Sequence, residues 1–473
     1  MTADRLRPAI LAGAALVLCV AALALFWPGV AMYDTVAQYG QVLAGEYEDW
    51  HPPIMARLWA VLRGSAGGVP PAAPMLLLQM ALYWFGLGLI AVTLVRIGKL
   101  QGGIAVLLVG VVPLFLGWQG TVLKDAQMLG AMLAAVGIVG WWRLRAARVP
   151  FFAWLLAAVL LGYATLVRAN AVFATVALVV MLVGPRSWWA RAVMALVGVG
   201  IVLAVSPVIN HAMLGAGKSG VERTEAIYDL SAIAVRAPGV FTGLTPSEIR
   251  TIAARHCVKP YFWDPLGEPD RCGPQVEGLH AYSPGTLYQM LAGAVLRAPG
   301  AYLQHRLGHW NSTERWLVGA GAPGALPPVR SQPNDLGLTS PGAAATVWQT
   351  IEGWTVDTPL GWPIAFLCCA LIGLTVALRR HVGAIRDFAL ALLVSAVLLE
   401  TSFLVLSIAS DLRYHLWSMV ATTVAIVLLV AERALTRREL MVGGVALALV
   451  ICSGTAARLV LPRAPATYAA QLL

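Results

Sequence analysis

The feature that most limits the fold of this chain is a series of long apolar segments separated by short polar ones. The segments hold roughly 18 to 24 residues, the length of helix that crosses about 30 Å of hydrocarbon. Strands of a membrane barrel need only about ten residues of alternating polarity, and these Val- and Leu-rich runs do not alternate. Of the 473 residues, 59% are hydrophobic and 12% charged, whereas about a quarter are charged in soluble domains. The sequence therefore predicts an all-α, polytopic transmembrane helical bundle.

Eleven segments are long and apolar enough to be predicted as spans, and they divide the chain into three parts. The segments are 8–27, 73–95, 103–120, 125–142, 150–167, 169–184, 190–210, 359–378, 388–409, 414–431 and 440–461. The parts are an N-terminal module 1–210 with a first external loop 28–71, an external and partly helical insertion 211–357, and C-terminal helices 358–473. The first run ends in "FWPG" without a small-residue cleavage site, which favours a retained helix over a signal peptide.

The basic residues are distributed by loop, which gives an orientation. With the N-terminus in the cytoplasm, the short connectors that carry Arg96, Arg143 and Arg379 all lie on the cytoplasmic side, as the positive-inside rule requires. The net charge of +10 is thus explained by topology, and no nucleic-acid partner is predicted. The expected partners are membrane lipids, and the acid-containing loops face the outside.

Polar groups gather at the external ends of several predicted helices. The stretch "MYDTVAQYGQVLAGEYEDWHPPIMARLW" follows the first span, "LKDAQM" opens the fourth, "VRAN" joins the fifth and sixth, and "DLRYHLW" opens the tenth. Any one of these groups could simply cap a helix or reach out to water. Charge held near hydrocarbon is costly, however, so four such sites at one depth favour a shared function. The residues concerned are Asp34, His51, Lys124, Asp125, Arg168, Asn170, Arg413, Tyr414 and His415.

These residue types suit one kind of chemistry. A carboxylate can deprotonate an attacking hydroxyl, and Arg or Lys side chains can stabilise a departing phosphate. A cavity lined by two carboxylates and several cations would combine both actions.

The pattern resembles the GT-C class of polytopic membrane glycosyltransferases, which includes protein O-mannosyltransferases and the lipid A aminoarabinose transferase. The resemblance lies in Asp34 on a juxtamembrane segment, in "HPPIMARLW" with His51 where Lys is common, in Asp125 of "LKDAQM" and in the pair Arg413-Tyr414. The resemblance covers the chain to about residue 184 and the "DLRYHLW" region. Within the class, the chain resembles a bacterial branch. The resemblance does not cover the external insertion.

The resemblance implies inverting transfer of a sugar from a polyprenyl-phosphate donor to a lipid, glycan or protein acceptor at the outer face of a bacterial cytoplasmic membrane. Asp34 is then the general base, and Asp125 positions a substrate or binds a divalent cation if one is used. The donor phosphate is expected on His51, Lys124, Arg168 and Arg413, with Asn170, Tyr414 and His415 as substrate contacts. A histidine in place of lysine titrates near neutral pH, so the contact at His51 is expected to be pH-dependent.

Other interpretations remain open at this stage. A transporter or flippase of a lipid-linked saccharide, an O-antigen ligase or polymerase, and an inactive relative would share the cations and the external loop. Glu400 is either a proton-relay group or merely interfacial, and His305 and His309 could share a helix face but lack a third metal ligand. Cys257 and Cys272 are candidates for a disulfide if the outer compartment is oxidising, with two free thiols as the alternative.

Overall fold

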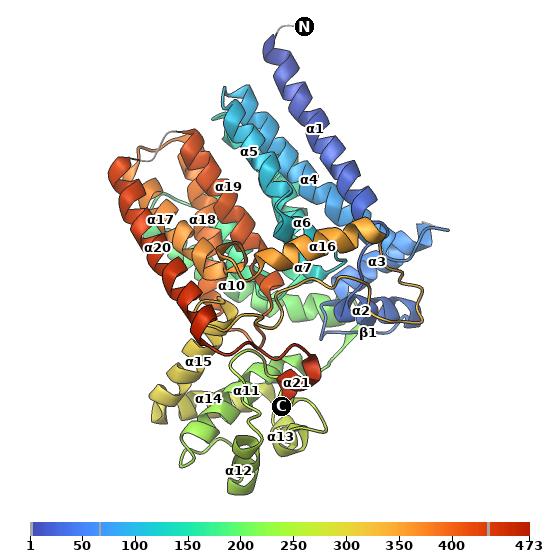
Figure 1. Cartoon of the computed structure of the whole chain (residues 1–473), viewed down its shortest axis with the longest axis vertical. Coiled ribbons are helices and arrows are strands. Elements are labelled where there is room, and N and C mark those ends of the chain that lie inside the picture. Colours follow the sequence, from blue (N-terminus) through green and yellow to red (C-terminus); the bar gives the residue numbers. More distant parts are fainter. Residues whose placement is uncertain (1–2, 66–67, 433–435) are drawn as a thin grey trace.

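The computed structural model describes residues 3–65, 68–432 and 436–473, and these parts of the chain are mostly helical. Figure 1 shows long helices in the upper part of the molecule and the short helices of the insertion below them, with the N-terminus at the opposite end from the insertion. The N-terminal helices are α1 (Ala3–Phe26), α2 (Tyr33–Ala44), α3 (Pro53–Ser65), α4 (Ala73–Arg96), α5 (Leu100–Gly110), α6 (Pro113–Gln119), α7 (Lys124–Arg143), α8 (Phe151–Val167), α9 (Ala171–Val183) and α10 (Trp188–Val208).

The insertion and the C-terminal part supply the remaining elements. The insertion holds α11 (Val221–Arg236), α12 (Pro246–Ala254), α13 (Gly273–His280), α14 (Pro284–Arg297), α15 (Pro299–Thr313) and α16 (Ala343–Thr355). They are followed by α17 (Pro363–Arg379), α18 (Ala384–Ser402), α19 (Leu416–Ala431), α20 (Arg437–Val460) and α21 (Tyr468–Leu472). Two short strands, β1 (Tyr47–Glu48) and β2 (Ala216–Gly217), pair in parallel and join the first loop to the start of the insertion.

Each of the eleven predicted spans coincides with a helix or a bent helix pair, but fewer meet the requirements for crossing a membrane. Among the described residues five helices are long and apolar enough, namely Leu6–Phe26, Ala73–Arg96, Trp188–Met213, Leu412–Ala431 and Arg437–Val460. The pair α5–α6, bent by 55°, gives a sixth if it is one span. The others fall short because α8, α9 and α17 have 17, 13 and 17 residues, while α7 and α18 carry ionisable residues at their ends. Eleven spans therefore remain a prediction.

Close packing of α7 on α4 positions the residues at the start of α7. A Cβ atom on Gly86 of α4 would lie 2.3 Å from the backbone of Leu133 on α7, and one on Gly137 would lie 2.7 Å from the carbonyl oxygen of Gly86. Only glycine allows the two backbones to approach so closely, as is usual where membrane helices pack through small residues. The N-terminus of α7, with Lys124 and Asp125, is thereby held against α4.

A buried amide network supports the break after α6. The Gln79 side-chain amide donates to the carbonyl oxygens of Gln119 and Thr121, at 2.5 and 2.9 Å, and that of Gln127 donates to Gln79 Oε1 at 3.0 Å. These bonds satisfy backbone groups that the end of the helix leaves open, which is essential where little water is present. The non-helical residues 120–123 can therefore lie deep in the bundle.

The insertion has a hydrophobic core of its own and contacts the bundle at both ends. Residues of α11, α12, α13 and α14 form that core, and a disulfide joins Cys257 to Cys272 within it. The predicted helix start at "TPSE" is present, with Thr245 and Glu248 forming a capping box at α12. In contrast, α16 at the end of the insertion lies across the bundle (Figure 1) and packs against α6 and α1. The segment 319–342 has no helix or strand.

Candidate functional site

Asp34 lies in the first turn of α2, where a short backbone pairing brings it close to α7. Val30, just before α2, forms a parallel bridge with Thr121, and the Val122 amide donates to the Val30 carbonyl oxygen at 2.9 Å. The Thr35 hydroxyl adds a bond of 2.6 Å to the carbonyl oxygen of Val122. These contacts place the start of α2 beside the start of α7, so Asp34 meets Lys124. The α2 dipole also favours a carboxylate in this first turn.

Lys124 lies between a carboxylate and an imidazole. Its Nζ atom is 3.5 Å from Asp34 Oδ2 and 2.9 Å from His51 Nδ1. A lysine at the first position of a helix is opposed by the helix dipole, and these two partners offset that cost. The ammonium group donates to Nδ1, so the His51 proton belongs on Nε2.

Arg413 faces three carboxylates. It stands in the 3₁₀ turn Leu412–His415 before α19, and its Nη1 atom is 2.8 Å from Asp34 Oδ2. Its Nη2 atom is 2.9 Å from Asp411 Oδ2, and its Nε atom is 3.8 Å from Asp125 Oδ2. The guanidinium therefore links α2, α7 and the start of α19 through one buried group.

Arg168 holds the other oxygen of Asp125. It follows α8, and its Nη1 atom is 2.5 Å from Asp125 Oδ1, while its Nε donates to Asn170 Oδ1 at 2.8 Å. Its guanidinium carbon lies 3.7 Å from the centre of the Tyr414 ring, a cation–π contact. Two guanidinium groups thus stand where a metal ion at Asp125 would have to bind, so the structure offers no support for the cation that the resemblance allowed there.

The charges of this site are balanced. Asp34, Asp125 and Asp411 face Lys124, Arg168 and Arg413, three of each sign. Burial by itself would raise the pKa of Asp34, but the charges of Arg413 and Lys124 outweigh it and hold that pKa well below its usual range. Asp34 is therefore ionised, with 8% of its surface exposed.

His51 differs from the sequence expectation of a residue that titrates near neutral pH. Burial, followed by the nearby charge of Lys124, lowers the pKa of His51 to about 3. The residue is 4% exposed and neutral over the physiological range. It orients Lys124 as a hydrogen-bond acceptor and carries no charge with which to attract a phosphate.

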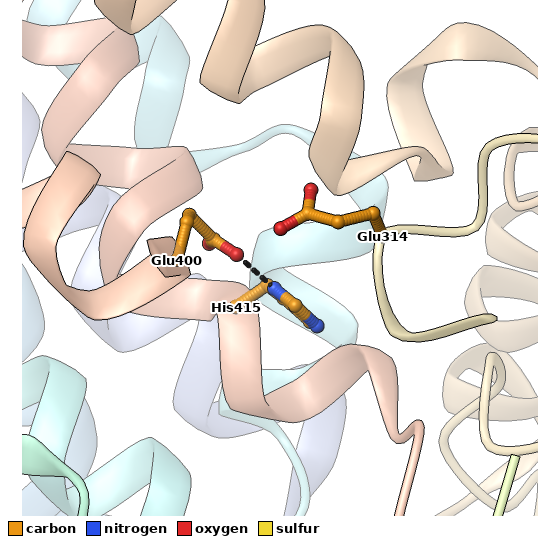
Figure 2. Close-up of side chains that lie close together, drawn as sticks. All are labelled: Glu314, Glu400 and His415. Atoms are coloured by element: carbon orange, nitrogen blue, oxygen red, sulfur yellow. Dashed lines mark hydrogen bonds and ion pairs between the residues drawn. The ribbon is translucent and has the colours of Figure 1, made fainter. Parts of the chain in front are cut away.

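His415 lies apart from these residues, although the sequence placed it among the substrate contacts. Its Nδ1 atom is 2.5 Å from Glu400 Oε2, and its ring is fully buried. The side chain of Glu314 completes this second cluster, as Figure 2 shows. Burial, then the Glu400 carboxylate, raise the pKa of Glu314 well above its usual range. Sequence reasoning missed Glu314 because no motif surrounds it.

The histidines of the insertion take separate structural partners. His305 Nε2 lies 3.3 Å from Asp229 Oδ1, whereas His309 Nδ1 lies 3.0 Å from the carbonyl oxygen of Pro260. Arg306 joins the same carboxylate at 2.8 Å and donates to the carbonyl oxygen of Ser407 at 2.8 Å. These contacts anchor the insertion on the loop after α18 and do not form a metal site from the two histidines.

Comparison with known proteins adds no family. No family model matches the chain, no curated protein matches it, and no solved structure matches it. The resemblance to GT-C enzymes therefore depends on the quoted sequence motifs alone.

The neutral state of His51 predicts a loss of stability in mild acid. Unfolded chains bind a proton at this residue below pH 6.5, whereas the folded protein does so only near pH 3. The stabilising contribution is therefore complete above pH 6.5 and is lost as pH falls toward 3, by about 2 kcal/mol at pH 5. Reversible unfolding in mixed micelles at pH 7.5 and 5 should show this loss in the wild type. His51→Gln, which keeps an acceptor for Lys124, should lose about 2 kcal/mol less; equal losses in both proteins would contradict the assignment.

Proposed function

We propose that this protein transfers a sugar from a polyprenyl-phosphate donor to a hydroxyl acceptor at the outer face of a bacterial cytoplasmic membrane, with inversion at the anomeric carbon. The observation that carries the proposal is the contact of one ionised carboxylate, Asp34, with Lys124 and Arg413 at the external ends of apolar helices. The N-terminus is then cytoplasmic and the insertion lies outside.

In the proposed reaction Asp34 takes the proton of the acceptor hydroxyl, whose oxygen attacks the anomeric carbon of the donor. The bond between that carbon and the phosphate oxygen breaks, and polyprenyl phosphate leaves with the electron pair. Lys124 and Arg413 stabilise the negative charge on the departing phosphate. Asp125 helps to hold Arg413 in place, with its Oδ2 atom 3.8 Å from Arg413 Nε. Arg168 in turn holds Asp125, with its Nη1 atom 2.5 Å from Asp125 Oδ1.

The balance of charges explains how a strongly acidic Asp34 can act as a base. In the structure its Oδ2 atom is paired with both Arg413 and Lys124, and such a carboxylate holds a proton poorly. A donor phosphodiester that recruits the same two cations weakens their hold on Asp34, and its own negative charge raises the proton affinity of the carboxylate. Binding of the donor therefore prepares the base.

The irregular segment 319–342 controls access in this proposal. The Ala31 amide donates to the Ser331 hydroxyl at 2.9 Å, and the Leu412 amide donates to the Gly324 carbonyl oxygen at 2.8 Å. The segment is thus hydrogen-bonded to the residues just before Asp34 and just before Arg413. Gly324 has a φ of +67°, and a Cβ atom there would lie 2.2 Å from Asp411 Oδ1, so no other residue fits this approach.

A transporter of lipid-linked saccharides is the second candidate, and one observation favours it. Transporters often contain broken helices near their substrate sites, and α5–α6 is bent by 55° at a short break. Such folds pair the break with a second one in the other half of the chain. Among the described residues α5–α6 is the one bent pair found, so the transferase is preferred.

The two functions are separated by presenting a panel of polyprenyl-phosphate sugars to the full chain in liposomes. A transferase should release polyprenyl phosphate from at least one donor, and the release should depend on an added hydroxyl acceptor. A transporter should move the intact donor between leaflets without cleaving it. Movement without cleavage for every donor in the panel would refute the transferase.

A further inference from the structure

A second cluster of ionisable side chains contains His415, which is two residues beyond Arg413 in the sequence. Glu314 directly follows α15, Glu400 lies near the end of α18, and His415 ends the turn before α19. Their exposed fractions are 0, 2 and 0%, and one nitrogen or oxygen atom from each lies within 4.8 Å of the others. Figure 2 shows the Glu314 carboxyl group directed toward the other two side chains. Three distant segments thus bring potential ligand atoms to one buried point.

The polar atoms of this cluster are incompletely satisfied within the described chain. Glu400 accepts from the Ser418 hydroxyl and contacts His415 Nδ1 at 2.5 Å. No amide, hydroxyl or basic side chain of the described residues donates to the Glu314 carboxyl group, which is left beside the Glu400 carboxyl group, and His415 Nε2 also lacks a partner. A buried carboxylate without a partner costs several kcal/mol, so an unpaired Glu314 calls for a bound cation or a proton.

The neighbouring arginines are directed elsewhere. Arg315 Nη1 donates to the carbonyl oxygens of Ala322 and Pro323, each at 3.2 Å. The Arg413 guanidinium faces Asp34 and Asp411. The positive charge that would compensate the Glu314–Glu400 pair is therefore not supplied by either of them.

We propose that Glu314, Glu400 and His415 bind one divalent transition-metal ion of the Zn²⁺ or Mn²⁺ class. Imidazole nitrogen suits these ions better than Mg²⁺ or Ca²⁺, and carboxylate oxygens bind them readily. Bonds of about 2.0–2.2 Å place ligand atoms roughly 3.4 Å apart in a tetrahedral site. All separations lie within 4.8 Å, so the ligand atoms close to this spacing with shifts of at most about 1.4 Å, within reach of a glutamate side chain. A water molecule or the Ser418 hydroxyl completes the coordination, and binding displaces any proton shared by His415 and Glu400.

The ion has a structural role in this proposal. It joins the exit of α15 from the insertion to α18 and to the turn Leu412–His415, which carries Arg413. The ion therefore fixes the position of Arg413 through the turn that Arg413 shares with His415. It does not contact Asp34 or Lys124. The proposal does not depend on the proposed glycosyl transfer, because metal content is measured independently of activity.

The test is the metal content of the full chain, purified in detergent without chelators. We expect about one equivalent of Zn²⁺ or Mn²⁺ in the wild type by elemental mass spectrometry. Stripped protein should take the ion up again from micromolar solution, in competition with a chromogenic chelator. Glu314→Gln should weaken this uptake at least 10-fold. Glu352→Gln is the matched control, since Glu352 is equally buried and its carboxyl oxygens also lack partners, but it lies on α16 away from the cluster.

Three outcomes would overturn the proposal. They are equal metal binding by wild type and Glu314→Gln, equal losses in Glu314→Gln and Glu352→Gln, or a wild type that neither contains nor takes up the ion. The last result would leave a proton shared by the two carboxyl groups as the explanation of the cluster. If Glu314→Gln does not yield folded protein, X-ray absorption of the loaded wild type decides. One imidazole with oxygen ligands is expected, and sulfur or several imidazoles would refute the site.

Discussion

Replacing Arg413 with methionine is expected to lower the free energy of unfolding by about 3–5 kcal/mol, the usual result of removing one partner from a buried ion pair. Arg413 is 6% exposed and lies within 2.8 to 3.8 Å of oxygens from Asp34, Asp411 and Asp125. Without the guanidinium these carboxylates repel one another at close range. Unfolding of the purified full chain in mixed micelles measures the loss.

The control for Arg413 is Arg223→Met, which removes a guanidinium 3.7 Å from the partly exposed Glu222. Exposed pairs contribute about 0–1 kcal/mol, so the control should change little. The double variant Arg413→Met/Asp34→Asn should also be less destabilised than Arg413→Met, because one of the opposed charges is gone. A loss of the same size in Arg413→Met and the control would show that Arg413 is not the centre of the cluster.

The helices and the cluster around Asp34 could be predicted because both depend on local patterns. Apolar runs locate helices regardless of what surrounds them, and each predicted span does coincide with a helix or a bent pair. Alternation of loops then predicts that Asp34, Lys124 and Arg413 lie at one membrane depth. The structure shows that these three are in direct contact, through the short pairing of Val30 with Thr121.

The burial of single side chains, and contacts of residues outside any motif, could not be predicted. His51 is neutral because it is buried against Lys124, and no motif reports burial. Glu314 joins Glu400 and His415 only because α15 ends beside α18, and the sequence around it carries no signal. Eleven spans likewise remain a prediction, because hydropathy does not reveal that α9 is only 13 residues long.

Asp34→Asn is expected to reduce turnover of the polyprenyl-phosphate donor by a factor of about 10²–10⁴, the usual contribution of a general base. Asparagine has nearly the same shape and still accepts a hydrogen bond from Arg413, but an amide cannot take the proton of the acceptor. The substitution also frees Lys124 and Arg413 from a carboxylate at 3.5 and 2.8 Å. Donor binding should therefore be kept or become tighter while turnover falls. Rates of polyprenyl phosphate release and the donor Kd, measured together, test this pair of effects.

The opposite behaviour of binding and turnover distinguishes a base from a structural carboxylate. If Asp34 only holds the cluster together, its loss should weaken donor binding and turnover alike. Asp49→Asn is the matched control, because Asp49 belongs to the same loop but accepts from the Ser219 amide at 2.7 Å and contacts His211 at 3.4 Å, away from Lys124. Asparagine keeps the acceptor atom there, so the control should turn over donor within a few-fold of wild type. Turnover by Asp34→Asn at the rate of the Asp49 control would remove Asp34 from the mechanism, and the base would have to be sought elsewhere around Arg413.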